Sequence, residues 1–481
     1  MADTEKCVLA LYDCRSKQEY IYRTNRIREI SGGSALLADV YKMFFRKADE
    51  KGIKINSDWK SEKEFSVDSF TESGCDGEVI YEGGGNLFVI FRSRETYIRA
   101  NRIFSKMLLD ETYSISLVAS CVEVSGNFLD DRKSLYEENA RIKATGSASV
   151  PCSVLPITQV DNATYMPIVK KTTVDGKPVS LSRESVLKLK AFEKIKNKGE
   201  KFLDDISGKE NKGIESLIAV IYVDGNAMGK KVKGCTEGKS GYTECVRALR
   251  ELSENTNKTF VERPLSAIEK MLEEKDESSG GKWRTVIAGG DEITIICHAR
   301  AALDIAMTYF KTLEEENETL DTDKKNYACM GIAIAHSHAP FADVYKIAEQ
   351  CCESGKKKSR AKDSMVNYVD FHFCHAGLIN DLDTIRENSD KDYIARPYEF
   401  SEEFRQFAEL GKKIGRIGRA NIKELAAAII RGDSFYRFEA ERILSRYPDC
   451  GIQSGSEKQK KLIFDIANIY DLWFAESEES E

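Results

Sequence analysis

Two adjacent acidic residues, Asp291 and Glu292, follow a glycine pair between two runs of β-branched and apolar residues. The glycines Gly289 and Gly290 can adopt the positive φ angles of a tight turn, so the stretch predicts a β-hairpin with two carboxylates at its tip. Carboxylates on a rigid turn are hard oxygen ligands of the kind that Mg²⁺ or Mn²⁺ selects. Taken alone, the stretch is equally compatible with a surface turn whose acids are solvated.

A third acid, Asp224, ends the apolar run 217–223, which predicts a buried strand. In a sheet built from a strand, a helix and a hairpin, the first strand lies beside the hairpin. We therefore expect Asp224 to lie close to Asp291 and Glu292. Three neighbouring carboxylates repel one another, and one or two divalent cations would relieve that repulsion. Two such ions could activate a ribose 3′-hydroxyl and hold the triphosphate that it attacks.

Small and basic residues near these acids predict phosphate binding. Gly225 and Asn226 follow the strand acid, so phosphates could approach backbone N–H groups at the next turn, with two nearby lysines as counter-charges. The segment 342–352 has helical spacing and runs into a basic cluster at 356–360. This cluster is a candidate phosphate clamp, and a solvated helix end is the alternative interpretation.

The elements that must position these residues occur twice. The order strand, helix, hairpin, helix, strand is predicted over residues 7–124 and again over residues 217–335. The predicted fold class is therefore α+β, with two ferredoxin-like β-α-β-β-α-β domains and additional helical regions. The predicted domains are a first ferredoxin-like domain at 1–145, a partly helical connector at 146–213, a second ferredoxin-like domain at 214–380 and a helical domain at 381–481.

An internal duplication is the simplest explanation of this recurrence. It matches Asp13 with Asp224, and the turn at 83–86 with the hairpin turn at 289–292. In the first copy Gly85-Asn86 stands in place of the two turn acids. We therefore expect its turn geometry to persist without the charge that a metal would need.

The composition excludes several classes of protein. A net charge of -7 over 481 residues argues against a protein that coats nucleic acid through bulk electrostatics. The Lys-rich segment 187–202 is interpreted as a solvated part of the connector rather than a nucleic-acid site. The 13 cysteines form no CxxC pair, which argues against a zinc site or a disulfide framework and favours a reducing cytosol. No apolar run is long enough to predict a membrane span, so a cytoplasmic protein is expected.

Three segments together carry a resemblance to a known family. Residues 224–229, 289–292 and 340–358 resemble the second palm domain of the large polymerase/cyclase-like subunit of type III CRISPR effector complexes. They are similar, more distantly, to GGDEF diguanylate cyclases. The first copy resembles the other palm of that subunit, and the connector and the C-terminal helices take the places of its middle and terminal helical domains.

The resemblance implies ATP-dependent synthesis of 3′-5′ linked oligoadenylate signals in antiviral defence. Asp224 and Asp291 would be the metal-binding acids, and Glu292 would support a second metal or the attacking hydroxyl. The first copy would hold a second nucleotide without activating it, with Ser34 at the start of a helix as a candidate contact. The residues that would hold triphosphate are Lys356, Lys357 and Arg360.

The sequence departs from the family pattern at several points. An N-terminal HD nuclease domain is not evident, because all five histidines lie far downstream, and the zinc-binding cysteine pairs of the middle region are missing. The second acid of the family's strand-end loop is Asn226 here, and the last acid of its GGDD turn is Glu292. The number of bound metals therefore stays open. We expect a stand-alone protein rather than a subunit of a CRISPR complex.

These observations predict a metal-dependent nucleotidyltransferase that makes a small cyclic or linear oligonucleotide messenger from nucleoside triphosphates, with ATP favoured. A separate effector protein would respond to the product. The alternative is a pair of palms that senses nucleotides or scaffolds an effector without turnover. Asn226 and the uncharged first turn favour this second interpretation.

Overall fold

The computed structural model groups the chain into two compact units, and each is described here by itself. The first unit comprises Met1–Glu200, Ala227–Val261 and Gly289–Asp291, and the second comprises Lys201–Asn226, Glu262–Ala288 and Glu292–Glu481. The structure describes residues 6–24, 26–83, 85–145, 155–174, 177–196, 216–274, 283–321, 324–362, 365–374, 381–389 and 391–475. Much of the predicted connector, at 146–154 and 197–213, lies outside the described residues, as do Gly84 and most of the acidic tail.

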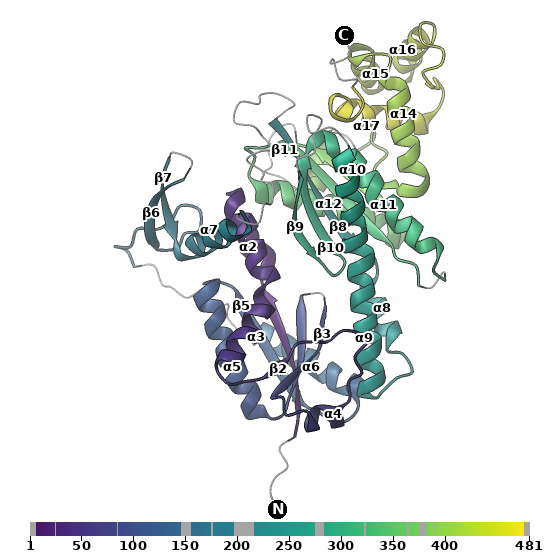
Figure 1. The fold of residues 1–481 in the computed structure, drawn as a ribbon. Helices are drawn as coiled ribbons and strands as arrows, with labels where there is room; N and C mark the ends of the chain where they lie inside the picture. Colours follow the sequence, from purple (N-terminus) through teal and green to yellow (C-terminus); the bar gives the residue numbers. More distant parts are fainter. Residues whose placement is uncertain are drawn as a thin grey trace, which may run out of the picture. The chain divides into compact units, whose positions relative to one another are not determined.

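The first unit contains a five-stranded sheet in the order β2-β3-β4-β1-β5 (Figure 1). The central strand β1 is antiparallel to both β4 and β5. Without the short strand β2, the order is that of a ferredoxin-like domain, as predicted. The strands are β1 (Val8–Arg15), β2 (Ile55–Asn56), β3 (Gly77–Gly83), β4 (Asn86–Phe91) and β5 (Ser116–Glu123).

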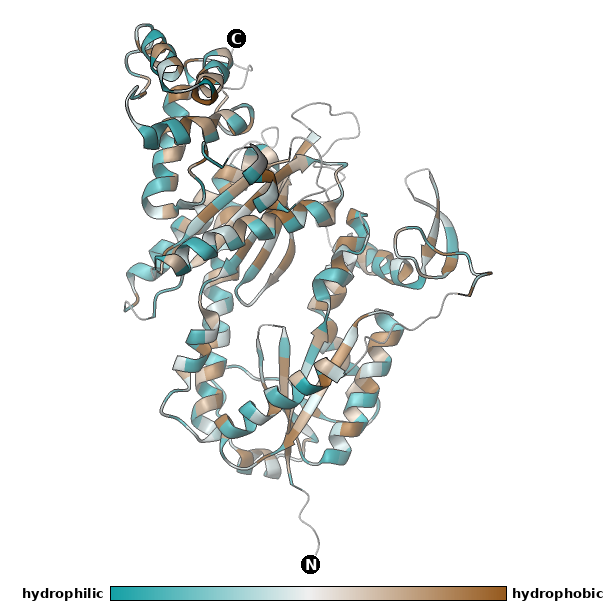
Figure 2. Ribbon diagram, turned by 180° about the vertical axis from the view of Figure 1, so that it is seen from behind, coloured by the Kyte–Doolittle hydropathy of each residue, from teal (hydrophilic) through white to brown (hydrophobic). Residues whose placement is uncertain are grey.

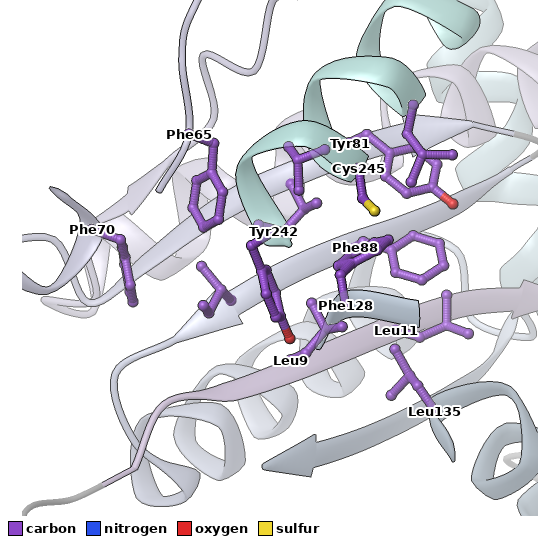
Figure 3. Packing of buried hydrophobic residues seen from close by; sticks show 14 residues of the cluster. Leu9, Leu11, Phe65, Phe70, Tyr81, Phe88, Phe128, Leu135, Tyr242 and Cys245 are labelled. Atoms are coloured by element: carbon purple, nitrogen blue, oxygen red, sulfur yellow. The ribbon is translucent and has the colours of Figure 1, made fainter. Parts of the chain in front are cut away.

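Apolar side chains cover both faces of this sheet, because β1 is an almost continuous apolar run. On one face Phe44 and Phe104 stack at 4.3 Å between ring centroids and both contact Tyr12. On the other face Leu9 and Leu11 belong to the cluster of buried side chains in Figure 3. The helices involved are α3 (Val40–Glu50), α5 (Arg94–Glu111), α6 (Phe128–Thr145) and α9 (Tyr242–Asn257).

Helix α9 comes from the second copy of the repeat, between its first strand and its hairpin, yet it packs against β3 of the first sheet. Its fully buried Arg250 donates hydrogen bonds of 2.7 and 2.8 Å to the carbonyls of Ile80 and Val79. These carbonyls lie where the register of β3 shifts at a bulge. The guanidinium therefore satisfies backbone acceptors that the irregular ladder leaves available.

Ser34 was predicted at the start of a helix, and this prediction is wrong. The preceding Gly32 and Gly33 already lie inside α2 (Ile27–Ala38), where a Cβ on Gly32 would come within 1.8 Å of the carbonyl oxygen of Lys188 on α7. The glycines therefore permit close packing of two helices. Ser34 consequently lies in the second half of α2 and not at its start. The neighbouring elements are α1 (Lys17–Tyr22), β6 (Ile168–Val174), β7 (Lys177–Ser182) and α7 (Arg183–Lys196).

Helix α7 is also more buried than a solvated connector would be. The side chains of Lys188 and Glu184 are fully buried and form an ion pair of 2.7 Å. Arg23 pairs with the same carboxylate at 2.8 Å, and Ser185 donates a hydrogen bond of 2.7 Å to the buried Glu29. This network compensates the cost of burying charge at the contact between α2 and α7.

The second unit contains a six-stranded sheet in the order β13-β12-β11-β8-β10-β9. Its last four strands repeat the ferredoxin-like order of the first sheet, and β12 extends it by pairing parallel to β11. Strands of both sheets are predominantly hydrophobic in Figure 2. The strands are β8 (Leu217–Gly225), β9 (Trp283–Gly289), β10 (Glu292–His298), β11 (Ala328–His336), β12 (Tyr368–Phe373) and β13 (Tyr398–Glu399).

Helices complete the second unit, and its C-terminal part is helical, as predicted. Within the described ranges, no helix is both long and apolar enough to span a membrane. The larger helices of this unit are α10 (Arg263–Glu274), α11 (Ala302–Glu318), α12 (Phe341–Ala361), α14 (Arg405–Gly415), α15 (Arg419–Arg431), α16 (Asp433–Leu444) and α17 (Glu457–Trp473). Other short helices in the described residues are α4 (Val67–Glu72), α8 (Met228–Cys235), α13 (Leu382–Ser389), the π-helices Lys258–Glu262 and Phe400–Phe404, and a 3₁₀ turn at Ala299–Ala301.

Candidate active site

The end of β8 and the start of β10 bring two carboxylates together. Glu292 lies directly opposite Asp224 in the antiparallel register of the two strands. Directly opposite residues project from the same face of a sheet, with Cβ atoms about 5 Å apart. The sheet therefore places Asp224 beside the hairpin, as predicted. Two like charges in this position repel unless a cation lies near them.

The hairpin turn that precedes Glu292 is the tight turn expected from the sequence. Gly290 has a φ of 65°, a conformation that favours glycine, and Gly289 is the last residue of β9. Asp291 is the second turn residue and comes directly before Glu292 in the chain. A Cβ placed on Gly289 would meet no heavy atom of the described residues within 4 Å, so among them this position leaves space that a ligand could use.

A lysine from α12 supplies the positive charge at the strand acid. The ammonium group of Lys356 forms an ion pair with the Asp224 carboxylate, and the two side chains are 14% and 29% exposed. Burial disfavours the charge of this ammonium, but the adjacent Asp224 carboxylate outweighs burial and raises the pKa of Lys356. Lys356 therefore stays protonated and neutralises one of the two opposed acids.

Close packing against the sheet fixes the position of α12. A Cβ on Gly331 of β11 would lie 1.9 Å from the carbonyl oxygen of Ala348, so only glycine permits this approach. The Cys352 thiol donates a hydrogen bond of 3.2 Å to the Cys329 carbonyl. The ring of Tyr345 meets that of Tyr222 edge to face at 5.6 Å.

The other basic residues of α12 do not join Lys356 at the acids. The helix was expected to end near residue 352, but it continues to Ala361 and so spreads the basic cluster around its axis. Lys357 pairs with the exposed Asp383 at 3.1 Å, and Arg360 pairs with Glu353 at 2.8 Å. The structure thus brings together only one of the three predicted triphosphate ligands with the carboxylates.

Asn226 connects the end of β8 to neighbouring backbone. It is buried, its N–H donates to the Tyr327 carbonyl at 2.7 Å, and its side-chain amide donates to the Val366 carbonyl at 3.4 Å. Gly225 is also buried and pairs with Ala328 of β11. An amide suits this position because it can donate to a carbonyl, which an ionised carboxylate cannot do.

Sequence reasoning missed one further carboxylate. Glu349 lies on α12 and is half-buried. Burial and then the Asp224 charge raise the pKa of Glu349. Burial, Glu292 and Asp224 likewise raise the pKa of the Tyr222 hydroxyl. The signal that could have found Glu349 is its helical spacing, seven residues before Lys356, which places the two side chains on one face of the helix.

The donor set fits a hard divalent cation that keeps several water or phosphate ligands. Within the described part of the chain, no group of three or more His, Cys, Asp or Glu side chains is arranged as a metal site. Asp224 and Glu292 nevertheless provide two opposed carboxylates, and Mg²⁺ is commonly held by one or two carboxylates together with substrate phosphates. The residues present are therefore compatible with Mg²⁺ or Mn²⁺ bound together with a nucleotide.

Comparison with known proteins agrees with this arrangement. Residues 217–366 match the sequence model of the Cas10/Cmr2 second palm domain. The chain carries a Cas10-like tandem palm. No curated protein matches it significantly. Solved structures with the same fold include Csm1 in T.onnurineus, at a TM-score of 0.56 and 13% identity, covering 98% of this chain and 70% of that one.

Two complexes of related proteins show the same fold with ligands. A Csm1-Csm4 cassette in complex with cA4 has a TM-score of 0.55 and 12% identity, and covers 97% of this chain and 70% of that chain. A cassette in complex with AMPPNP has a TM-score of 0.54 and 12% identity, covering 98% of this chain and 69% of that one. These likenesses establish a common fold with Csm1.

The first palm has a different set of side chains at the equivalent place. Asp13 lies opposite Asn86 in the register of β1 and β4, and pairs with Lys143 of α6 at 2.5 Å. The carbonyl of Gly85 accepts hydrogen bonds of 2.5 Å from Lys17 and 2.8 Å from the Tyr41 hydroxyl. In the first palm, the turn that corresponds to the 289–292 hairpin turn is therefore bonded by side chains of the same palm.

Proposed function

We propose that the second palm is a metal-dependent nucleotidyltransferase that joins nucleoside triphosphates, with ATP favoured, into a small cyclic or linear oligonucleotide messenger. One observation carries the proposal. In a Cas10-like palm, Asp224 lies opposite Glu292, and Lys356 forms an ion pair with the Asp224 carboxylate. A purely structural site gains nothing from opposed carboxylates, because their repulsion destabilises the fold.

In this proposal Asp224, Asp291 and Glu292 hold Mg²⁺ or Mn²⁺. Such a cation, when bound, stabilises the charge that develops on the phosphates and lowers the pKa of the attacking hydroxyl. The carboxylates would hold the cation beside the phosphate groups. Glu292, which lies opposite the strand acid, would support a second metal or accept a hydrogen bond from the attacking hydroxyl.

The basic and small residues around the acids have separate roles. Lys356 pairs with Asp224, and it would be able to bind the triphosphate if a cation neutralised that carboxylate. Gly289 leaves room for a phosphate close to the backbone, and Gly225 and Gly290 would lie beside that phosphate. Lys357 and Arg360 would have to exchange their exposed carboxylate partners for phosphate to take part. Such exposed pairs contribute little stability and exchange readily.

The product would act as a signal in antiviral defence, read by a separate effector protein. Support comes from the Cas10-like palm and from Csm1-Csm4 structures solved with ATP, with pppApA and with cA4. The second candidate function is nucleotide sensing without turnover. It is favoured by Asn226, which stands in place of the family's second acid and whose side-chain amide donates a hydrogen bond to the Val366 carbonyl.

Incubation of the full chain with each NTP or dNTP and Mg²⁺ or Mn²⁺ tests the proposal. We expect pyrophosphate release and a product whose mass identifies its bases and its cyclic or linear form. Asp291→Ala should lower product formation by at least about a thousandfold, because a metal-binding acid acts in the transition state. The melting temperature should change little, since a turn acid adds little packing. Tight binding with nucleotide recovered unchanged would instead establish the sensing function.

A further inference from the structure

Glu349 lies on the face of α12 that looks toward Asp224. It follows Tyr345 by four residues and precedes Lys356 by seven, and these spacings share one face of a helix. Tyr345 contacts Tyr222 of β8, and Lys356 pairs with Asp224 of the same strand. Glu349 is thus held between two side chains that both reach β8.

The Glu349 carboxylate has no bonded partner within the described residues. It is half-buried, and the structure assigns it neither a hydrogen bond nor an ion pair in the ranges that it describes. Its pKa is raised, first by burial and then by the charge of Asp224. An acid in this position destabilises the fold at neutral pH, so its presence calls for an explanation other than packing.

The internal duplication allows Glu349 to be compared with its counterpart in the first palm, which shows whether this position is needed for packing. Helices α6 and α12 both follow the fourth ferredoxin-like strand of their sheet and both begin with phenylalanine, Phe128 and Phe341. Lys143 and Lys356 each follow that phenylalanine by fifteen residues, and each pairs with the acid of its first strand. The two helices therefore align without a gap.

In this alignment the counterpart of Glu349 is Tyr136, eight residues into each helix. Tyr136 packs edge to face on Phe88 at 6.0 Å, and the Arg132 guanidinium lies 5.5 Å from its ring centroid. The first palm thus uses this position for packing. Of the two palms, only the second has an acid at this position, Glu349. The same is true of the position opposite the strand acid, where the second palm has Glu292.

A second polar group on the same face also lacks a partner. Thr294 lies two residues after Glu292 on β10, so both side chains project from one face of the sheet, opposite Tyr222. Thr294 is 0% exposed, and its hydroxyl has no hydrogen-bond partner among the residues that the structure describes. Buried hydroxyls are normally satisfied, so this face combines polar groups in a way that packing alone does not favour.

We infer that Glu349 is a positioning residue of the catalytic face, whose negative charge strengthens the binding of a divalent cation at Asp224 and Glu292 without ligating it. The inference rests on the proposed function. A carboxylate held near a bound cation in a partly desolvated site attracts it through space. Charges on the helix that are more exposed and already paired act weakly, because water, salt and the partner screen them.

Titration of the full chain with Mn²⁺ alone, by isothermal titration calorimetry, tests this inference. Glu349→Gln keeps the size of the side chain and should weaken Mn²⁺ binding by about tenfold. The matched control is Glu353→Gln on the same helix, because Glu353 is 43% exposed and pairs with Arg360. The control should change binding by less than about twofold. Glu349→Tyr, which copies the first palm, should weaken binding at least as much as Glu349→Gln.

Thermal unfolding distinguishes this role from a structural one. Removing an unpaired acid that is repelled by Asp224 should leave the melting temperature unchanged or raise it, whereas loss of a structural contact would lower it. Equal Mn²⁺ affinities for the Glu349→Gln and Glu353→Gln proteins would overturn this inference alone. Absence of Mn²⁺ binding by the unmodified protein would overturn both the inference and the proposed function.

Discussion

The two palms place a strand acid and a helix lysine in equivalent positions and differ in the acids around them. In the first palm Asp13 faces the neutral Asn86, and one lysine balances one carboxylate. In the second palm Asp224 pairs with Lys356 and faces a second carboxylate, that of Glu292. This second carboxylate, rather than the strand acid or the lysine, is what distinguishes a candidate metal site from its duplicate.

The largest expected difference concerns the two strand acids. Asp224→Asn should lower product formation by at least about a thousandfold, because the substitution removes a proposed metal ligand while keeping the size of the side chain. Asp13→Asn in the first palm should lower it by no more than about threefold. Initial rates of pyrophosphate release at saturating nucleotide measure both effects. Equal losses would show that the first palm also takes part in the chemistry.

The helices α6 and α12 approach their sheets differently, and this predicts the next effect. Gly331 of the second palm corresponds to Ser120 of the first, since each lies opposite the matching residue of the central strand. Gly331→Ala should destabilise the second palm by about 3 kcal/mol, because the new Cβ meets the Ala348 carbonyl. Ser120→Ala removes only a hydrogen bond of 3.3 Å and should cost about 1 kcal/mol. Urea unfolding followed by circular dichroism measures both changes.

The two lysines sharpen the comparison further. Lys356→Met should raise the KM for nucleotide by about tenfold, because it removes a positive charge beside the proposed phosphate site. Lys143→Met should leave KM unchanged, because its partner Asp13 lies opposite a neutral residue. A similar rise in KM for both variants would mean that the first palm also binds substrate through its lysine.

The pH dependence of stability provides an independent measure of the Lys356 pair. The pKa of Lys356 is raised in the folded protein, so the folded state binds this proton more tightly than the unfolded state. The stabilisation is therefore complete at neutral pH and disappears as the pH rises through the raised pKa. The difference in melting temperature between the unmodified protein and Lys356→Met should accordingly shrink in strongly alkaline buffer.

Local sequence was sufficient to predict the elements that carry the strand acid and the turn. The apolar run 217–223 and the glycine pair before Asp291 each determine a conformation through neighbouring residues alone. The recurrence of their order then gave the ferredoxin-like topology, because few arrangements of such elements are physically permitted. The placement of Asp224 opposite Glu292 followed from that topology, and the register of β8 and β10 confirms it.

Other features depended on contacts between residues far apart in the chain. Ser34 was predicted at the start of a helix, but it lies in the second half of α2, beside the glycine at which α7 packs closely. All charged residues of the basic cluster at 356–360 are positive, so the sequence does not indicate which of them contacts the acids. The docking of α12 on β11 brings Lys356 to Asp224. Arg250 likewise acquired its role from a bulge in the other sheet.

The sequence by itself thus determined the duplicated order of strands and the residues at the ends of β8 and β10, since β-branched runs and turn glycines act over a few neighbouring positions. Tertiary structure alone decided which lysine balances Asp224 and that Glu349 faces the same carboxylate. The physical reason is that helix rotation relative to a sheet is set by close packing, here at Gly331, and packing partners are separated too widely in the chain for local patterns to identify them.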